Sequence, residues 1–156
     1  MRNINRIDSN GLFLGVSSVY DEINYDSSQN VTLDELRQIK LNELKNSCDI
    51  TIMGKFTATV NGVTYSFSND FAAQSNFKDA KDAWSNGYIP NTQTIKWTAY
   101  DSNGNVVRLD LTEEQFDPIN IARMTWQLTN VSKLRDTLEP LVNVAQSQLD
   151  LDKIKW

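Results

Sequence analysis

The chain has 156 residues, with 15 Lys and Arg against 20 Asp and Glu, and a formal net charge of -5. It contains no His and a single Cys. These counts exclude a Ser-His-Asp triad, a Cys-His dyad, a His metal site, a disulfide framework and a zinc knuckle. The acidic balance also argues against nucleic-acid binding, which uses a basic face.

The length fits one domain with small appendages, and a chain of this size buries enough surface to fold without disulfides or metals. No apolar run approaches the roughly 20 residues of a membrane span, and the first residues lack the apolar stretch of a signal peptide. Composition alone therefore predicts a soluble α+β domain, and it indicates no particular function.

The N-terminal segment predicts a β-hairpin arm. Asn10-Gly11 is a strong hairpin signal because both residues tolerate positive φ, and it separates a short polar stretch, residues 3–8, from an apolar strand. Two short strands are marginally stable in water, so we expect the arm to lean on the rest of the chain or on another protein. Residues 17–31 indicate an extended linker. The predicted division is an arm with its linker, residues 1–31, and an α+β domain, residues 32–156.

The α+β domain opens with a predicted helix. Thr32 begins a capping box, Thr-Leu-Asp-Glu, and apolar residues then recur three or four apart. Cys48 belongs to this apolar face, and we expect it to be buried as a small hydrophobe. We expect the helix to run to about Met53, where Gly54 would end it in the left-handed conformation.

The next segment is the clearest element. Strands 56–60 and 63–67 alternate apolar and polar residues around a type I′ turn at Asn61-Gly62. A second helix follows over residues 70–85, capped by Ser68 or Asn69. Its apolar stripe consists of Phe71, Gln74, Phe77, Ala80 and Trp84.

A second hairpin, residues 93–111, turns at Asp101-Ser102-Asn103-Gly104. Thr112-Glu113-Glu114-Gln115 is a further capping signal. Asp117-Pro118 suits an N-cap followed by a first helical residue, so we expect a long helix to restart there. Because Pro140 removes a backbone bond, we expect a kink or break near Leu138.

The long helix carries an apolar stripe at Ile121, Met124, Leu128, Val131, Leu134 and Leu138. The spacing has two interpretations. It favours an amphipathic helix that covers the apolar faces of the two hairpins. The alternative is a coiled-coil seam, because the first four positions follow the heptad step of three and four.

Together these elements predict an α+β fold: two β-hairpins in a small antiparallel sheet, packed with three to four helices, including a long C-terminal helix, plus the N-terminal hairpin arm. No Gly-rich phosphate loop or nucleophile elbow is present. Glu113 and Glu114 fit a helix first turn better than a catalytic pair. The loop after Asp101 fits a turn better than a calcium site. We therefore predict no enzymatic activity, no metal and no cofactor.

The four Trp residues divide into two groups. Trp84, Trp97 and Trp126 fall on or beside apolar stripes, which predicts core packing with a partner for each buried indole N–H. Trp156 ends the chain after a polar stretch, so it is either disordered or docked as an interface anchor. The candidate partner-docking residues are Leu12, Phe13, Leu14 and Trp156.

The order of these elements resembles an uncharacterised C-terminal domain of tailed-bacteriophage tail proteins. The opening, Ile7-Asp8-Ser9-Asn10-Gly11-Leu12-Phe13-Leu14-Gly15, is similar to the N-terminal hairpin of phage tail-fibre assembly proteins and related tail-tip proteins. The resemblance covers residues 1–16 loosely and 32–156 more fully. The segments that carry it in the larger part are Lys45-Asn46-Ser47-Cys48, Tyr65-Ser66-Phe67, Phe71-Ala72-Ala73-Gln74-Ser75-Asn76-Phe77, Thr112-Glu113-Glu114-Gln115 and Leu151-Asp152-Lys153-Ile154-Lys155-Trp156.

The resemblance implies a virion protein of the tail, baseplate or tail fibre, found in the host cytoplasm during assembly. Its partners would be other tail or fibre proteins or a second copy of the chain, with no nucleic acid, membrane or small-molecule substrate. Two alternatives stay open. One is a tail-fibre assembly chaperone that leaves the finished particle. The other is a receptor- or glycan-binding module that uses exposed aromatic residues.

Overall fold

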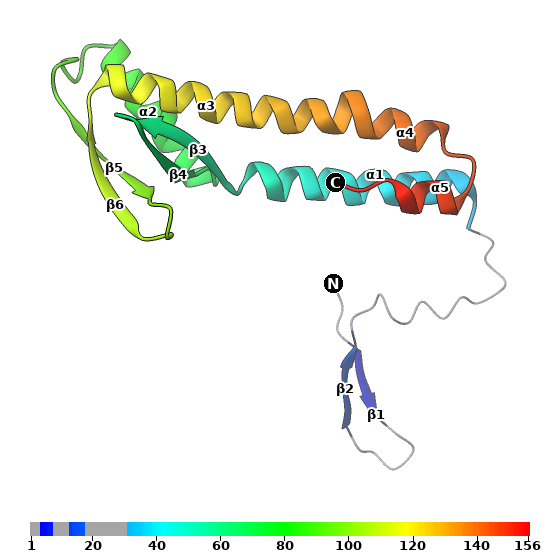
Figure 1. The fold of residues 1–156 in the computed structure, drawn as a ribbon. Coiled ribbons are helices and arrows are strands. Elements are labelled where there is room, and N and C mark those ends of the chain that lie inside the picture. The colour runs from blue at the N-terminus through cyan, green and yellow to red at the C-terminus, as the bar shows by residue number, and fades with distance from the viewer. Residues whose placement is uncertain (1–3, 8–12, 18–30) are drawn as a thin grey trace. The chain divides into compact units, whose positions relative to one another are not determined.

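The computed structural model describes residues 4–7, 13–17 and 31–156, and the chain divides into two compact units, Met1–Thr32 and Leu33–Trp156 (Figure 1). In the smaller unit, β1 (Ile4–Ile7) pairs antiparallel with β2 (Phe13–Ser17), as the predicted hairpin requires. The predicted Asn10-Gly11 turn and most of the predicted linker lie outside the described residues.

The larger unit has the predicted α+β class. Its four strands form one antiparallel sheet in the order β3-β4-β5-β6. The chain after β6 continues as a long helical rod, and α1 lies beside this rod and runs in the opposite direction (Figure 1). The elements are α1 (Leu33–Ile52), β3 (Lys55–Val60), β4 (Val63–Ser68), α2 (Phe71–Ser85), β5 (Ile95–Tyr100), β6 (Val106–Leu111), α3 (Glu113–Ser132), the π-helix η1 (Lys133–Leu138), α4 (Glu139–Val144) and α5 (Gln148–Lys153).

The β3–β4 hairpin matches its prediction in register and turn. Phe56 pairs with Phe67 and Val60 with Val63, so the apolar residues of both strands share one face. Asn61 has a φ of 50° and Gly62 a φ of 82°, both left-handed, as a type I′ turn needs. The right-handed twist of this turn matches that of the strands, which explains the tight two-residue connection.

The β5–β6 hairpin is also confirmed, and it turns where the sequence predicts. The Asp101 carboxylate accepts hydrogen bonds from the backbone N–H groups of Asn103 and Asn105, at 2.9 and 2.8 Å. The side-chain amide of Asn105 also donates to this carboxylate, at 3.1 Å. This bond first, and the backbone bonds after it, lower the pKa of Asp101. The acidic side chain therefore closes the turn. Between β4 and β5 one ladder pair is formed, Ser66 with Tyr100.

Two separate apolar cores hold the larger unit together. The first, which we call the sheet core, lies between the sheet, α2 and the first half of α3, and aromatic side chains fill most of it. The second, the helical core, joins α1 to η1, α4 and α5. The sheet core contains Phe56, Val60, Phe67, Phe77, Trp84, Ala99, Leu111, Phe116 and Ile119. The helical core contains Leu44, Cys48, Leu134, Leu138, Val142, Ala145, Leu151 and Ile154.

The predicted N-cap of α2 and the predicted conformation of Gly54 after α1 are wrong, although α1 ends at Ile52, close to the predicted Met53. The N-cap of α2 is Asp70, whose Oδ1 accepts a 2.8 Å hydrogen bond from the backbone N–H of Ala73, and not Ser68 or Asn69. Asn69 is instead fully buried, because it bridges the end of α1 to α2. Gly54 follows α1 but lacks the predicted positive φ. A Cβ on this glycine would lie 3.1 Å from the carbonyl oxygen of Thr51, so close approach favours glycine here.

The predicted restart at Asp117-Pro118 is also wrong, because α3 runs without interruption from Glu113. The Thr112 and Gln115 side chains form the predicted capping box at its start. Pro118 lies one turn later, and its fixed φ is compatible with a helix. Pro118 has no backbone N–H, so the carbonyl of Glu114, four residues earlier, has no partner within the helix. Both residues are exposed, so water can hydrogen-bond to that carbonyl.

Near Pro140 the helix changes its winding where a break is predicted. The six residues of η1 form a π-helix, and the N–H of Glu139 donates to the carbonyl of Leu134, five residues earlier. Buried positions then recur every fourth residue, at Asn130, Leu134, Leu138 and Val142. In a regular α-helix a four-residue step overshoots a full turn by about 40°. The wider π winding cancels this drift and keeps one face on α1.

Candidate protein interface

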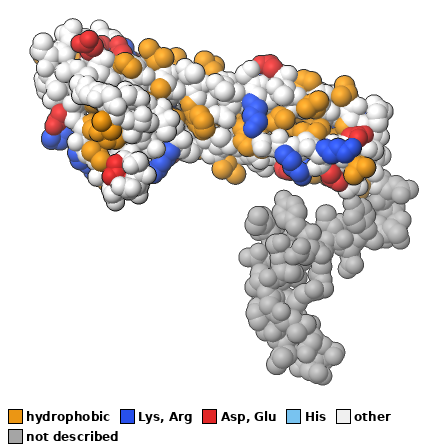
Figure 2. Space-filling view, viewed as in Figure 1, with side chains coloured by type: hydrophobic (Ala, Val, Ile, Leu, Met, Phe, Trp, Pro, Cys, Tyr) orange, Lys and Arg blue, Asp and Glu red, His pale blue; other side chains and the backbone are white. Residues whose placement is uncertain are grey.

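Helix α3 has two apolar faces, and one of them is uncovered. The inner face, with Phe116 and Ile119 fully buried, packs into the sheet core. The outer face, which we call the α3 stripe, consists of Ile121, Met124, Leu128 and Val131. These four side chains are 62%, 48%, 66% and 39% exposed. Figure 2 shows hydrophobic side chains at the surface along the rod that contains α3.

The geometry of an α-helix explains why both faces cannot be covered at once. At 100° per residue, the mean direction of the α3 stripe lies roughly 150° from the mean direction of the inner positions, which are the buried Phe116, Ile119 and Asn130 and the half-buried Trp126. The favoured interpretation of the sequence, in which the stripe covers the sheet, is therefore wrong for its first four residues. Only Leu134 and Leu138 of the predicted stripe are buried, and they belong to the helical core.

The segment of α3 that carries the stripe is almost without charge. Between Pro118 and Ser132 the chain has one charged residue, Arg123. Its guanidinium lies 5.4 Å from the ring centroid of Phe77, and its Nε donates to Asn120 at 3.0 Å. Burial lowers the pKa of Arg123. The cation is therefore turned toward the sheet core and leaves the stripe apolar.

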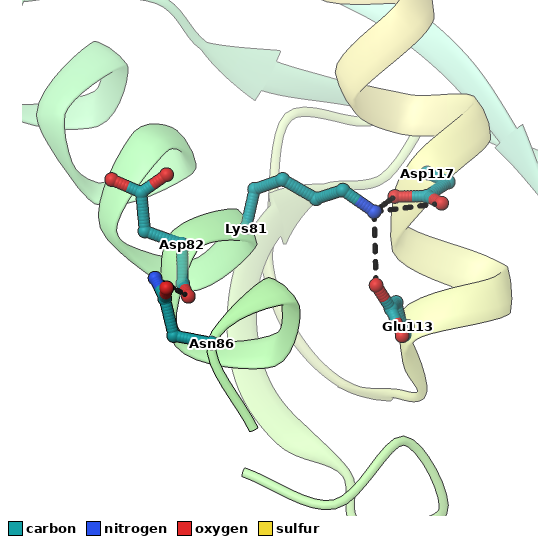
Figure 3. A network of polar contacts seen from close by, with 5 residues as sticks. All are labelled: Lys81, Asp82, Asn86, Glu113 and Asp117. Carbon is teal, nitrogen blue, oxygen red and sulfur yellow. Dashed lines mark hydrogen bonds and ion pairs between the residues drawn. The ribbon is translucent and has the colours of Figure 1, made fainter. Parts of the chain in front are cut away.

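Charged residues mark the two ends of the stripe. Asp117 precedes it by four residues and Arg135 follows it by four. The Nζ of Lys81 on α2 lies 2.8 Å from Oδ1 of Asp117 and 2.9 Å from Oε1 of Glu113 (Figure 3). These hydrogen bonds, led by the one to Asp117, raise the pKa of Lys81. Glu113 thus joins α2 to the first turn of α3, beyond the dipole role predicted for it.

Of the docking residues predicted from sequence, only Trp156 has a described side chain. It is half-buried against the helical core, and the Nζ of Lys133 lies 4.4 Å from its ring centroid. Trp156 is therefore docked on its own chain. Leu12 lies outside the described residues, while Phe13 and Leu14 occupy β2 in the other unit.

The predicted core role of the other Trp residues is confirmed in part. Trp84 is buried, whereas Trp97 and Trp126 are half-buried against the sheet core. The indole Nε1 atoms of Trp84 and Trp126 are buried without a hydrogen-bond partner, so the expected partners are absent for these two. Trp97 contacts Phe77 with ring centroids 4.6 Å apart.

Trp97 also lines a groove of about 590 Å³ between the start of α2 and β5. Tyr100 and Asn76 line the same groove, together with acidic and basic side chains. The Nζ of Lys55 lies 3.3 Å from the ring centroid of Tyr100, so this ring already has a cationic partner in its own chain. The groove is open and polar, and it combines aromatic and amide groups.

Two acidic residues of α2 form contacts within their own helix. Asp82 pairs with Lys78 at 2.5 Å, and Asp79 lies 3.4 Å from the hydroxyl of Ser75. Across residues 4–7, 13–17 and 31–156, no group of three or more His, Cys, Asp or Glu side chains is arranged to hold a metal ion. Among the helices of those residues, none has the length and apolar character needed to cross a bilayer.

The sequence pattern contains the four residues of the α3 stripe, and its favoured interpretation placed them against the hairpins, with a coiled-coil seam as the alternative. A competing pattern was present: Phe116, Ile119 and Trp126 form a second apolar face on the same helix. A helix can turn only one of two such faces toward its own sheet. Comparison of the chain with protein-family models, curated proteins and solved structures finds no match.

Proposed function

We propose that this chain is a structural docking protein of a tailed-bacteriophage tail, baseplate or tail-fibre apparatus, and that it binds its neighbours through the α3 stripe. The exposure of the stripe carries the docking part of this proposal. The phage setting is an expectation that follows from the resemblance of the element order and of the opening residues 7–15 to tail-associated proteins.

The stripe differs from ordinary surface apolar residues because its members are contiguous. Single exposed apolar side chains are common on folded proteins, but contiguous patches rimmed by polar residues mark interaction sites. Burying the exposed part of each stripe side chain contributes on the order of 1 kcal/mol. A partner that covers all four therefore gains enough to offset part of the entropy lost on association.

The first test is mass spectrometry of purified mature virions. A structural component gives peptides of this chain in a fixed ratio to the tail proteins. If the chain is abundant in infected-cell lysate but absent from virions, the assembly-chaperone alternative replaces the structural role. In that case the α3 stripe is still expected to contact the fibre chain.

The second test addresses the stripe itself. Leu128→Glu places a charge at the most exposed position of the stripe, so it should abolish incorporation of the chain into tails. Ile50→Glu is the matched control, because Ile50 on α1 is 75% exposed and lies outside the stripe. Equal incorporation of both variants would contradict docking through α3.

A second candidate function is glycan binding in the groove lined by Trp97, Tyr100 and Asn76. Aromatic rings and planar amides are the groups that contact sugar faces and hydroxyls. Titration of the chain with host-surface glycans, followed by Trp fluorescence, tests this candidate. Binding that Tyr100→Ala removes and Leu128→Glu leaves unchanged would favour it over docking through the stripe.

A further inference from the structure

We propose that the occupant of the α3 stripe is the α3 stripe of a second copy of the chain, packed antiparallel about a two-fold axis. This inference rests on the proposed function, because it names the partner of the same surface. The spacing of the stripe, the charges at its ends and the residues at its middle each support it.

The spacing indicates a helical partner. The stripe positions follow steps of three, four and three residues, which is the a-d-a-d pattern of a left-handed coiled coil. In such a seam each side chain inserts between residues of a facing helix at a crossing angle near 20°. Since the rest of the surface of α3 is polar or already packed, the stripe presents one narrow seam to one helix.

The stripe is also symmetric about its centre, near Trp126. In an antiparallel pair centred there, Ile121 faces Val131 of the second copy, and Met124 faces Leu128 of the second copy. Each layer then joins an a position to a d position, which is the layer composition of an antiparallel coiled coil. The outer layers then pair two β-branched side chains, Ile121 and Val131. The inner layers pair an unbranched side chain, Met124, with a γ-branched one, Leu128.

The charges at the ends of the stripe select this direction. Continuing the heptad by four residues on each side reaches Asp117 and Arg135. In the antiparallel pair, Asp117 of one copy, whose carboxylate is already bound by Lys81 of its own chain, faces Arg135 of the other copy at both ends of the seam. In a parallel pair, Asp117 would face Asp117 and Arg135 would face Arg135. Like charges placed opposite each other oppose association, so the end charges favour the antiparallel pair.

The residues that flank the centre are compatible with a two-fold axis. Thr125 and Gln127 lie on either side of the seam, and each would approach its own counterpart in the second copy. A charged residue at such a position would repel itself. Both residues are uncharged and can hydrogen-bond to an identical side chain. The chain has a net charge of -5, yet the surface that would meet a copy of itself is neutral.

The size of the seam sets the expected affinity. From Asp117 to Arg135 the helix rises about 27 Å. Four apolar side chains per copy give an interface at the lower end of the range for specific complexes, below about 1,200 Å² in total. Helix α3 is already held by the sheet core, so pairing does not require a helix to form. We therefore expect a reversible dimer with a Kd in the micromolar range.

Cross-linking tests both the partner and the direction. Single cysteines are introduced at Ile121→Cys and at Val131→Cys in a Cys48→Ala background, and a short bismaleimide is added. The antiparallel dimer predicts that a mixture of the two variants cross-links between copies, while each variant alone does not. Ile50→Cys is the matched exposed control, and it should remain uncross-linked.

Sedimentation across a concentration series provides the second measurement. The weight-average mass of the unmodified chain should rise toward that of a dimer over the micromolar range. Leu128→Glu should remain monomeric, and Ile50→Glu should dimerise like the unmodified chain. Arg135→Glu should weaken the dimer at least tenfold, because it places acidic residues opposite each other at both ends.

The outcomes separate this inference from the proposed function. Cross-linking of Ile121→Cys to itself would overturn the antiparallel arrangement. A chain that stays monomeric at high micromolar concentration would overturn self-association. If Leu128→Glu nevertheless abolished incorporation into tails, the proposed function would stand with a different protein on the stripe. If Leu128→Glu changed neither incorporation nor mass, both would fail.

Discussion

The Nδ2 atom of Asn69 donates a 2.6 Å hydrogen bond to the carbonyl oxygen of Ile52, and it thereby fastens the end of α1 to the loop before α2. The backbone N–H of Asn69 also donates to the carbonyl of Gly54 at 3.0 Å. Its own carbonyl accepts from the Gln74 side chain at 2.8 Å. This fully buried residue therefore joins the C-terminal end of α1 to the first turn of α2.

Asn69→Ala should lower the free energy of unfolding by about 1–2 kcal/mol, because the carbonyl of Ile52 loses its donor. The loss is limited because the Oδ1 atom of Asn69 is itself buried without a partner, and the substitution removes that cost. Urea denaturation measures the change. Asn103→Ala, at an exposed turn position, is the control and should change stability by less than about 0.5 kcal/mol.

The two faces of α3 provide a matched pair of isoleucines. Ile119 is fully buried and Ile121 is 62% exposed. Ile119→Ala should cost about 3 kcal/mol, because it removes buried volume from the sheet core. Ile121→Ala should cost less than about 0.5 kcal/mol in a dilute monomer. Thermal denaturation at low concentration compares the two, and similar losses would contradict the assignment of the faces.

The contacts of Lys81 predict a modest contribution to stability. Lys81→Met removes a cation from between two carboxylates, and the partly exposed site limits the loss to about 0.5–1 kcal/mol. Lys78→Met is the control, since Lys78 forms an exposed ion pair with Asp82 alone. Denaturation at low and high salt measures the difference. If both variants lost the same free energy of unfolding, the contacts of Lys81 between α2 and α3 would contribute no more to stability than an exposed ion pair.

The pH dependence of this contribution follows from the raised pKa of Lys81. A group whose pKa is higher in the folded state adds stability that is fully present below its unfolded pKa, here 10.5. That stability is lost as the pH rises through the folded-state pKa. The difference between Lys81→Met and the unmodified chain should therefore be constant near neutrality and shrink above pH 10.5. A difference that grows with pH in this range would contradict the sign.

The thiol of Cys48 should be unreactive in the folded chain. It is 2% exposed, and its Sγ lies 3.6 Å from the carbonyl oxygen of Asn130. Burial, and secondarily the charge of Asp49, raise the pKa of Cys48, so the reactive thiolate is scarce. A chromogenic disulfide reagent should label it only as fast as the helical core opens. Denaturant should release one thiol per chain, and rapid labelling without denaturant would contradict its burial.

Local sequence signals were sufficient for elements whose geometry depends on a few neighbouring residues. The Asn61-Gly62 turn follows from two residues that tolerate positive φ, and strand alternation then sets the register of β3 and β4. The Asp101 turn and the Thr112 capping box follow from side chains that hydrogen-bond to nearby backbone. Each of these predictions holds because the deciding contacts lie within a few residues along the chain.

Signals that depend on distant residues were insufficient. Asp70 caps α2 because Asn69 is held by Ile52, seventeen residues away. The break predicted near Pro140 becomes a π-helix because Leu134 and Leu138 must both face α1. In each case a local preference was outweighed by packing between segments far apart in sequence.

The sequence by itself determined that α3 is a helix and that Ile119 and Ile121 both belong to apolar patterns. Only the tertiary structure decided which pattern lies inside. The aromatic rings of Phe77, Trp97 and Phe116 pack in tilted and edge-to-face pairs, with centroids no more than 5.3 Å apart, beneath the sheet. The face of α3 that carries Phe116 and Ile119 therefore enters the core. A helix can bury only one face against one sheet, so the equally apolar face that carries Ile121 is left exposed.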